Sequence, residues 1–368
     1  MALPRMLILL SAASIFAMGL VMIFSTTSAE ILDHELGRNT HQALIKQIYY
    51  AFGGIGLSLL IIKLGYQNLL RYSAPLLAFF TLLLVLALIP GIGREVNGSR
   101  RWLHLAGFSF QPSEFVKYLI PAYFIHQFLK FSDKEFLFID FIKLVGVVSI
   151  PMLLILIEPN NGTTAVIGTT LLALFLLTRI RFIYWAWPLL IFSIAVGSFA
   201  SQLPYVTARL KVYLDPELDL KGKGHQPYQA KIAAGSGNFW GKGPGNSLQK
   251  LSYLPEAQND YIAAIYAEEF GFAGLMALIT LYLLLSSQGF YIAYHSRELG
   301  GFYLAACVSF LISLQAFLNL GVVSGLLPST GLNLPLFSQG GSSLMANIAG
   351  LSVLMSVTMD SDKKEGKI

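Results

Sequence analysis

Charged side chains are scarce in this sequence. Asp, Glu, Lys and Arg make up 12% of its 368 residues, whereas hydrophobic residues make up 55%. Typical soluble domains carry about twice that share of charged residues. A water-soluble globular protein is therefore excluded, and the surplus of apolar side chains predicts that lipid surrounds much of the chain.

Cysteine pairs, metal-binding patterns and nucleotide-binding motifs are also missing. The single cysteine, Cys307, stands inside an apolar run, which excludes a disulfide or a cysteine metal cluster within the chain. The histidines show no metal-ligand spacing, and the carboxylates form no recognisable cation cage. Neither G-x-G-x-x-G nor G-x-x-x-x-G-K-[ST] occurs, so a nucleotide-driven reaction has no predicted site. The net charge of +5 is scattered over short loops, which excludes a nucleic-acid partner.

What the sequence has instead is a series of apolar windows. Each is long enough for a transmembrane helix, which needs about 20 apolar residues. They predict an all-α polytopic membrane protein with about ten transmembrane helices, in a single domain that covers residues 1–368. The first window is too long for the apolar part of a signal peptide, so we expect an uncleaved helix. The windows are residues 6–26, 47–65, 72–90, 114–130, 139–157, 163–179, 183–201, 261–287, 301–326 and 341–359.

An even number of spans places both termini on one side of the membrane. Short cytoplasmic loops are enriched in Lys and Arg, and two small loops on the side of the termini carry basic residues without any acid. Cytoplasmic termini are therefore predicted, although the opposite face also carries basic residues. On that face the polar loops are residues 27–46, 91–112, 202–260 and 327–340. Segment 202–260, between the seventh and eighth helices, is the predicted large extracytoplasmic loop, and loops of such length commonly bind or gate a ligand.

Asp260 directly precedes an apolar helix at the end of this loop. Two interpretations remain open. As an N-cap, its side chain would satisfy free amide groups of the helix and stabilise it by about 1 kcal/mol. As a general base, it would accept a proton from a hydroxyl nucleophile, provided that the site shields it from bulk water.

Other ionisable residues stand where charge is costly. Glu268 and Glu269 lie about two turns into the next apolar window, where they would face a cavity of the bundle or pair with a buried cation. Glu114 and Lys117 are three residues apart at the start of a helix and share one face. They would form an ordinary ion pair or, beside Arg101, hold an anionic headgroup.

Two further segments, one polar and one apolar without charge, separate the helical windows. Residues 158–164, which begin with Glu158, predict a tight turn between two helices. Residues 327–343 include Ser338 and Ser342, are punctuated by Pro and Gly, and carry no charge. Irregular backbone at membrane depth is tolerated only where it packs in protein or lines a cavity.

Several longer motifs follow one another along the chain. They are Ser99-Arg-Arg-Trp-Leu, Phe110-Gln-Pro-Ser-Glu-Phe-Val-Lys117, Arg209 with Leu214-Asp-Pro216, Ala234-Gly-Ser-Gly237, Gly241-Lys-Gly-Pro-Gly-Asn-Ser-Leu-Gln-Lys250, Leu254-Pro-Glu-Ala257, Ala267-Glu-Glu-Phe-Gly271, and Leu334-Pro to Gly-Gly-Ser-Ser343. Taken together, these motifs resemble the SEDS family (shape, elongation, division and sporulation) of bacterial cell-wall synthesis over nearly the whole chain. Within it, Gly-Asn-Ser-x-Gln-Lys followed by Leu-Pro-Glu-Ala, and Gly-Leu-Asn-Leu-Pro, are more similar to the division member FtsW than to the elongation member RodA.

The resemblance implies a peptidoglycan glycosyltransferase of the cytoplasmic (inner) membrane that polymerises lipid II during division. Asp260 matches the family's catalytic carboxylate, and an undecaprenyl diphosphate-linked glycan would be the donor. A class B penicillin-binding protein and other division proteins are the implied partners, and a divalent cation (Mg or Mn) could accompany the diphosphate. The predicted substrate-binding residues are Arg101, Glu114, Lys117, Glu158, Arg209, Lys231, Lys242, Ser338 and Ser342.

The sequence departs from the family pattern at three sites. Gln258-Asn259 replaces the usual His-Thr before the catalytic Asp, Asn160 replaces an Asp in the turn after the fifth helix, and Gln339 replaces the Tyr of Ser-Tyr-Gly-Gly. Two other functions therefore stay open. A lipid II flippase would use Glu268 and Glu269 along a translocation path and would not need Asp260. A weakly active scaffold would instead bind a transmembrane helix of the penicillin-binding protein.

Overall fold

The structure is a computed structural model, and it confirms a membrane protein built from helices. It describes residues 1–34, 41–96, 99–105, 107–131, 135–190, 213, 224–251, 258–364 and 366. The helices are α1 (Ala2–His34), α2 (Gln42–Leu64), α3 (Tyr66–Arg71), α4 (Ser73–Leu88), α5 (Ser113–Leu129), α6 (Phe138–Ile157), α7 (Asn161–Leu177), α10 (His225–Ser236), α11 (Ile262–Tyr294), α12 (Leu299–Val323) and α13 (Gly341–Lys364).

Nine of these helices overlap nine of the predicted apolar windows. Within the described residues, six helices (α1, α2, α6, α11, α12 and α13) are long and apolar enough to cross a membrane, and α4 and α7 are shorter apolar helices. The seventh window, residues 183–201, overlaps a helical stretch at 182–190 and then leaves the described part of the chain. The total of ten spans stays a prediction.

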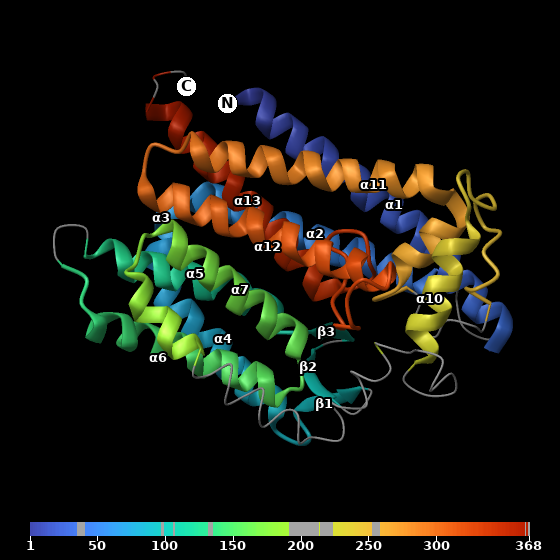
Figure 1. Cartoon of the computed structure of the whole chain (residues 1–368), viewed down its shortest axis with the longest axis horizontal. Coiled ribbons are helices and arrows are strands. Elements are labelled where there is room, and N and C mark those ends of the chain that lie inside the picture. Colours follow the sequence, from blue (N-terminus) through green and yellow to red (C-terminus); the bar gives the residue numbers. More distant parts are fainter. Residues whose placement is uncertain are drawn as a thin grey trace.

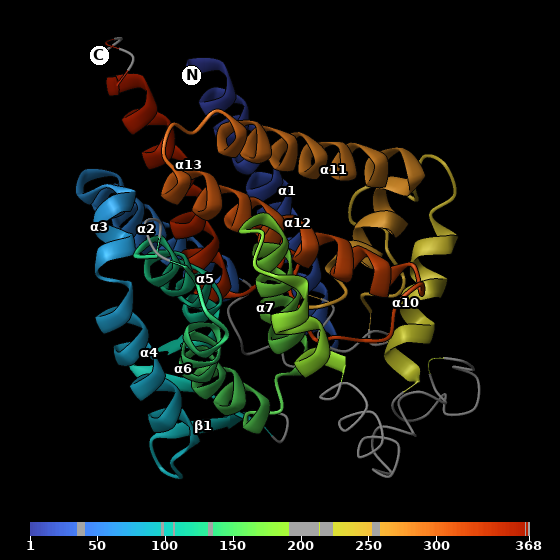
Figure 2. The same cartoon turned by 60° about the vertical axis from the view of Figure 1, so that its left-hand side comes forward.

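The helices run between two ends of the molecule, and each end holds different parts of the chain. Both termini lie close together at one end, where Arg5 of α1 forms an ion pair with Asp362 of α13 (Figure 1). The opposite end holds the strands and α10 (Figure 2). Helix α13 packs against α2, and α11 packs against both α12 and α1. The described parts of the polar loops predicted on the face opposite the termini therefore gather at one end of the bundle.

A small antiparallel sheet, which the sequence analysis did not predict, lies at this end. It consists of β1 (Gly93–Val96), β2 (Ser99–Leu105) and β3 (Phe108–Phe110), in the order β1-β2-β3. Leu103 is paired with Phe110 across β2 and β3. Helix α10, inside the predicted loop 202–260, was not predicted either. Most of the first half of that loop lies outside the described residues, so the loop as a whole stays a prediction.

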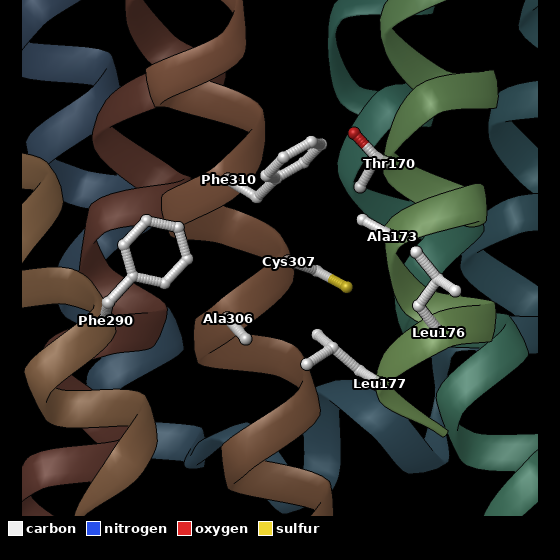
Figure 3. A pocket seen from close by; sticks show the side chains of 8 residues that line it. All are labelled: Thr170, Ala173, Leu176, Leu177, Phe290, Ala306, Cys307 and Phe310. Atoms are coloured by element: carbon white, nitrogen blue, oxygen red, sulfur yellow. The ribbon is translucent and has the colours of Figure 1, made fainter. Parts of the chain in front are cut away.

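An apolar cavity of about 260 Å³ lies between α7, α11 and α12. Figure 3 shows Thr170 and Ala173 of α7 facing Cys307 and Phe310 of α12 across it. The one hydroxyl in the lining, that of Thr170, donates to the main-chain carbonyl of Val166. This cavity offers no free polar group, so the chemistry belongs to the polar end of the bundle.

Candidate functional site

Asp260 lies at the polar end, just before α11 begins. Tyr261 occupies the N-cap position of that helix, so the prediction of Asp260 as the N-cap is off by one residue. The main-chain carbonyl of Asp260 accepts a hydrogen bond of 2.8 Å from Asn319 Nδ2. A Cβ on Gly331 would lie 3.8 Å from Asp260 Oδ2. The carboxylate therefore lies against the irregular segment 327–340.

Segment 327–340 is held by buried amide side chains from two helices. Asn319 Nδ2 also donates to Leu332 O (2.7 Å), and Gln315 Nε2 donates to Asn333 O (2.8 Å). From α2, Gln47 donates to Ser338 O and accepts from the main-chain amide of Gly340, both at 3.3 Å. The prediction that this broken backbone packs in protein is thus confirmed.

Side chains of the segment itself complete this packing. The Ser338 hydroxyl accepts from the main-chain amide of Leu334 at 2.9 Å, and Asn333 Nδ2 donates to Gln339 O at 2.8 Å. The main-chain amide of Gln339 in turn donates to Gln258 O at 3.0 Å. The segment and the turn before Asp260 therefore form one hydrogen-bonded unit.

Arg101 of β2 donates hydrogen bonds to the turn between α6 and α7. Its Nε donates to Glu158 O (2.7 Å), and a terminal guanidinium nitrogen donates to Pro159 O (2.6 Å). The turn also packs against segment 327–340, because a Cβ on Gly162 would lie 2.5 Å from Thr330 O. Turn 158–164 and the surroundings of Asp260 are thus linked through Thr330 and Gly331.

Glu158 is the most unusual ionisable group of this end. Its side chain is 0% exposed, and neither carboxylate oxygen has a hydrogen-bond partner among the described residues. Burial raises the pKa of this carboxyl group to about 8, against the opposing field of the Arg101 guanidinium. Glu158 therefore carries a proton at neutral pH and can act there as a hydrogen-bond donor.

Glu114 and Lys117 form the predicted i,i+3 pair, with Nζ 2.7 Å from Glu114 Oε2. The Lys117 side chain is 2% exposed and also donates to Gln315 Oε1 at 2.8 Å. Its ammonium group thus already has two acceptors inside the bundle. Through Gln315 it connects to Asn333 of segment 327–340.

Glu268 forms an ion pair, as one of its two interpretations expected, but the cation is the half-buried Lys242 and not a buried one. Lys242 Nζ lies 2.6 Å from Glu268 Oε1. The same carboxylate, which is 0% exposed, accepts from the Ser247 hydroxyl and from the main-chain amides of Leu248 and Gln249. Lys242, predicted to bind substrate, is therefore engaged by Glu268.

Glu269 makes a second ion pair beside the first. Lys250 Nζ lies 2.7 Å from Glu269 Oε1, and Ser25 of α1 lies within hydrogen-bond distance of both. Helix α11 breaks two residues later at Gly271, whose φ is +67°. A Cβ there would lie 2.3 Å from Gly241 N. The two ion pairs and this bend fasten segment 237–251 to α11.

The remaining predicted residues lie around these groups. A Cβ on Gly325 would lie 2.8 Å from Lys231 Nζ, which places that ammonium beside the end of α12. The Ser342 hydroxyl accepts from Gln111 N at 2.9 Å and so connects α13 to the start of α5. Arg209 lies outside the described residues. The structure thus brings Asp260 directly against segment 327–340, which contains Ser338. Lys117 reaches the segment through Gln315, and Arg101 and Glu158 reach it through turn 158–164.

Sequence analysis missed Gln315, Asn319 and Gln47. A signal was present for the first two, because amides four residues apart in an apolar window share one helical face. A polar side chain inside a membrane helix commonly marks an internal contact. Their partners, however, are main-chain carbonyls of distant segments, which no local pattern identifies.

Within the described residues, no three His, Cys, Asp or Glu side chains come together to hold a metal ion. The residues present therefore do not fit a metal site made by protein side chains alone. A divalent cation would have to be held mainly by the phosphates of a ligand.

The comparisons with known proteins identify the same family. Residues 5–363 match the family described as "Cell cycle protein", whose profile carries the names FtsW, RodA and SpoVE. The chain is 36% identical over 346 residues to "Probable peptidoglycan glycosyltransferase FtsW" of Legionella pneumophila, covering 92% of this chain and 86% of that protein. It is 34% identical to "Stage V sporulation protein E" of Bacillus subtilis, covering 96% and 97%.

Solved structures agree with these relatives. A chain from "Structural coordination of polymerization and crosslinking by a peptidoglycan synthase complex" superposes with a TM-score of 0.77 and 26% identity. The match covers 96% of this chain and 97% of that chain. The fold is therefore shared along the whole length.

Proposed function

Because the chain belongs to the cell cycle protein family of FtsW, RodA and SpoVE, the SEDS family that its motifs resemble, we propose that it is a peptidoglycan glycosyltransferase that polymerises lipid II during cell division. The observation that carries this proposal is the setting of Asp260. Its main chain is fixed by a buried amide, and its carboxylate lies against the irregular segment 327–340. A general base needs such a fixed position near its nucleophile.

In the proposed reaction, the 4-hydroxyl of the acceptor sugar attacks the anomeric carbon of the lipid-linked donor. Asp260 accepts the hydroxyl proton as the new C–O bond forms. The bond between the anomeric carbon and the diphosphate breaks, and the electron pair leaves with undecaprenyl diphosphate. Attack opposite the leaving group inverts the anomeric configuration.

The leaving diphosphate requires positive charge or hydrogen-bond donors. Lys231 and Arg209 are the proposed cationic contacts of the diphosphate. Arg101, Lys117 and Lys242 would join them where substrate binding breaks the hydrogen bonds that their side chains make inside the protein. Glu158, protonated at neutral pH, is a proposed donor to a phosphate or sugar oxygen. Ser338, Ser342 and Glu114 complete the proposed polar surface, and Mg²⁺ or Mn²⁺ would come with the diphosphate.

Partners and orientation follow from the same proposal. A class B penicillin-binding protein would crosslink the glycan that this chain makes, as the name of the similar synthase complex suggests for that assembly. Other division proteins would bind the pair. The polar end would face outward from the bacterial inner membrane, and both termini would be cytoplasmic.

Glycan synthesis by the purified complex with a class B penicillin-binding protein tests the proposal. Labelled lipid II and a divalent cation are added to the native chain, to Asp260→Asn, and to Asp140→Asn as the matched control. Asp140 undergoes the same carboxylate-to-amide change in the first turn of α6. We expect polymer from the native chain and from the control but none from Asp260→Asn. Equal polymer from all three, or none from a folded native complex, would favour the flippase or the scaffold.

A further inference from the structure

Asn319 joins two parts of the chain that meet at Asp260. It lies on α12, and its side chain is 1% exposed. Its Nδ2 donates to the main-chain carbonyls of Asp260 (2.8 Å) and Leu332 (2.7 Å). Both hydrogens of one amide are therefore used, one on the turn before α11 and one on segment 327–340.

Replacement of this amide would not be neutral. An apolar side chain removes the Asn319 donor from both carbonyls, and the loss of hydrogen bonds at a buried or half-buried position destabilises the local structure. Among the described hydrogen bonds of segment 327–340 from amide side chains, only that of Asn319 also reaches Asp260. Asn319 is thus the described amide side chain that ties Asp260 itself to the segment, beside the main-chain bond from Gln339 N to Gln258 O.

We propose that Asn319 is a positioning residue for Asp260, a role that rests on the proposed glycosyltransfer. It touches the main chain of Asp260 and acts on the reaction through that contact. A displacement of about 1 Å in a catalytic group can lower a rate by about 100-fold. Loss of this contact should therefore lower kcat and leave substrate affinity nearly unchanged.

Gln47 provides a matched control on the same segment. It is also a buried amide with two main-chain contacts, to Ser338 and Gly340, and it makes no described contact with Asp260. Asn319→Leu and Gln47→Leu each remove one such amide. Both should lower the thermal unfolding temperature, but only Asn319→Leu should displace Asp260.

The experiment measures kcat and KM for lipid II with the penicillin-binding protein complex of each variant. For Asn319→Leu we expect kcat to fall about 100-fold and KM to stay within about 3-fold, a shift of less than 0.7 kcal/mol by the affinity relation. Gln47→Leu should keep kcat within about 5-fold of the native value, or about 1 kcal/mol. Asn319→Gln, which keeps both donors, should recover part of the lost kcat. An unchanged kcat in Asn319→Leu, or an equal loss in Gln47→Leu, would overturn the proposal.

Hydrogen–deuterium exchange gives a readout that does not need activity. The peptide that contains Gln258 to Ile262 should exchange faster in Asn319→Leu than in the native chain and Gln47→Leu. Unchanged exchange there would refute the positioning role even if activity fell. If the native complex makes no polymer, the proposed function fails, while the exchange measurement still decides whether Asn319 fixes the Asp260 turn.

Discussion

Glu158 gives a pH dependence of stability whose size can be worked out from the structure. Its carboxyl group has an ordinary pKa of 4.5 and a pKa of about 8 in the folded chain, because burial disfavours the charged form. Well below the ordinary pKa the group is protonated in both states. As the pH rises toward 8, the unfolded chain gains by ionising and the folded chain does not, so stability is lost over this window.

In the middle of that window each pH unit lowers the free energy of unfolding by about 1.4 kcal/mol, and the slope is smaller near either pKa. Between pH 5 and pH 8 the loss from Glu158 alone is therefore about 3.5 kcal/mol. The side chain of Glu158→Gln cannot ionise, so burying its amide changes the free energy of unfolding equally at every pH. Between pH 5 and pH 8 the stability of the native chain should therefore fall by the stated amount relative to that of the variant.

Thermal unfolding in detergent, followed by intrinsic fluorescence at one scan rate, measures this difference. Unfolding temperatures of the two proteins are compared at half-unit steps from pH 5 to pH 8.5. Glu95→Gln is the control, because Glu95 is an exposed carboxylate paired with Arg100 at the same end of the molecule. The difference in unfolding temperature between Glu95→Gln and the native chain should stay nearly constant over this range.

A difference in unfolding temperature between the native chain and Glu158→Gln that does not change with pH would refute the reasoning. It would mean that Glu158 ionises normally, through water or a partner outside the described residues. A difference that grows with pH but reaches its plateau near pH 6 would mean that the Arg101 field offsets most of the burial effect. Infrared spectra of the native chain at pH 7 should show the protonated carboxyl band, and Glu158→Gln should lack it.

Two further predictions concern the bend of α11 and its ion pairs. Gly271→Ala should destabilise the fold by several kcal/mol, because its positive φ and its contact with a neighbouring main chain leave no room for a Cβ. Gly56→Ala, with open space around it, should be neutral or stabilising by up to about 1 kcal/mol in the same melting assay. Lys250→Met should destabilise by about 3 to 5 kcal/mol, since it leaves buried Glu269 unpaired. Lys250→Met combined with Glu269→Met should recover much of that loss, and a double variant less stable than Lys250→Met would contradict this account.

The sequence predicted the helices well because hydropathy is a local property. The window at residues 301–326 became α12 (Leu299–Val323), and the tight turn at Glu158 lies between α6 and α7 as expected. The sheet at residues 93–110 was missed because three short strands with mixed polarity give no clear alternation. Hydropathy therefore sufficed for the bundle and failed for its polar end.

Contacts between distant residues set the rest of the site. Glu268 had two open interpretations, and its partner Lys242 is 26 residues away in a glycine-rich segment. Asn319 and the carbonyl of Asp260 are 59 residues apart. Such pairs depend on how helices pack, which one sequence does not reveal. The motifs identified the family, but they did not tell substrate contacts from internal hydrogen bonds.

The ion pair between Arg5 and Asp362 has a consequence for biogenesis. These residues are 357 positions apart, so the ion pair forms only once residue 362 has been synthesised. The face of α1 that packs against α11 must likewise be covered by lipid, by another helix or by the insertion machinery until α11 has been synthesised. A ribosome stalled before α11 would expose this face, and chains truncated there should be preferred targets of membrane quality-control proteases.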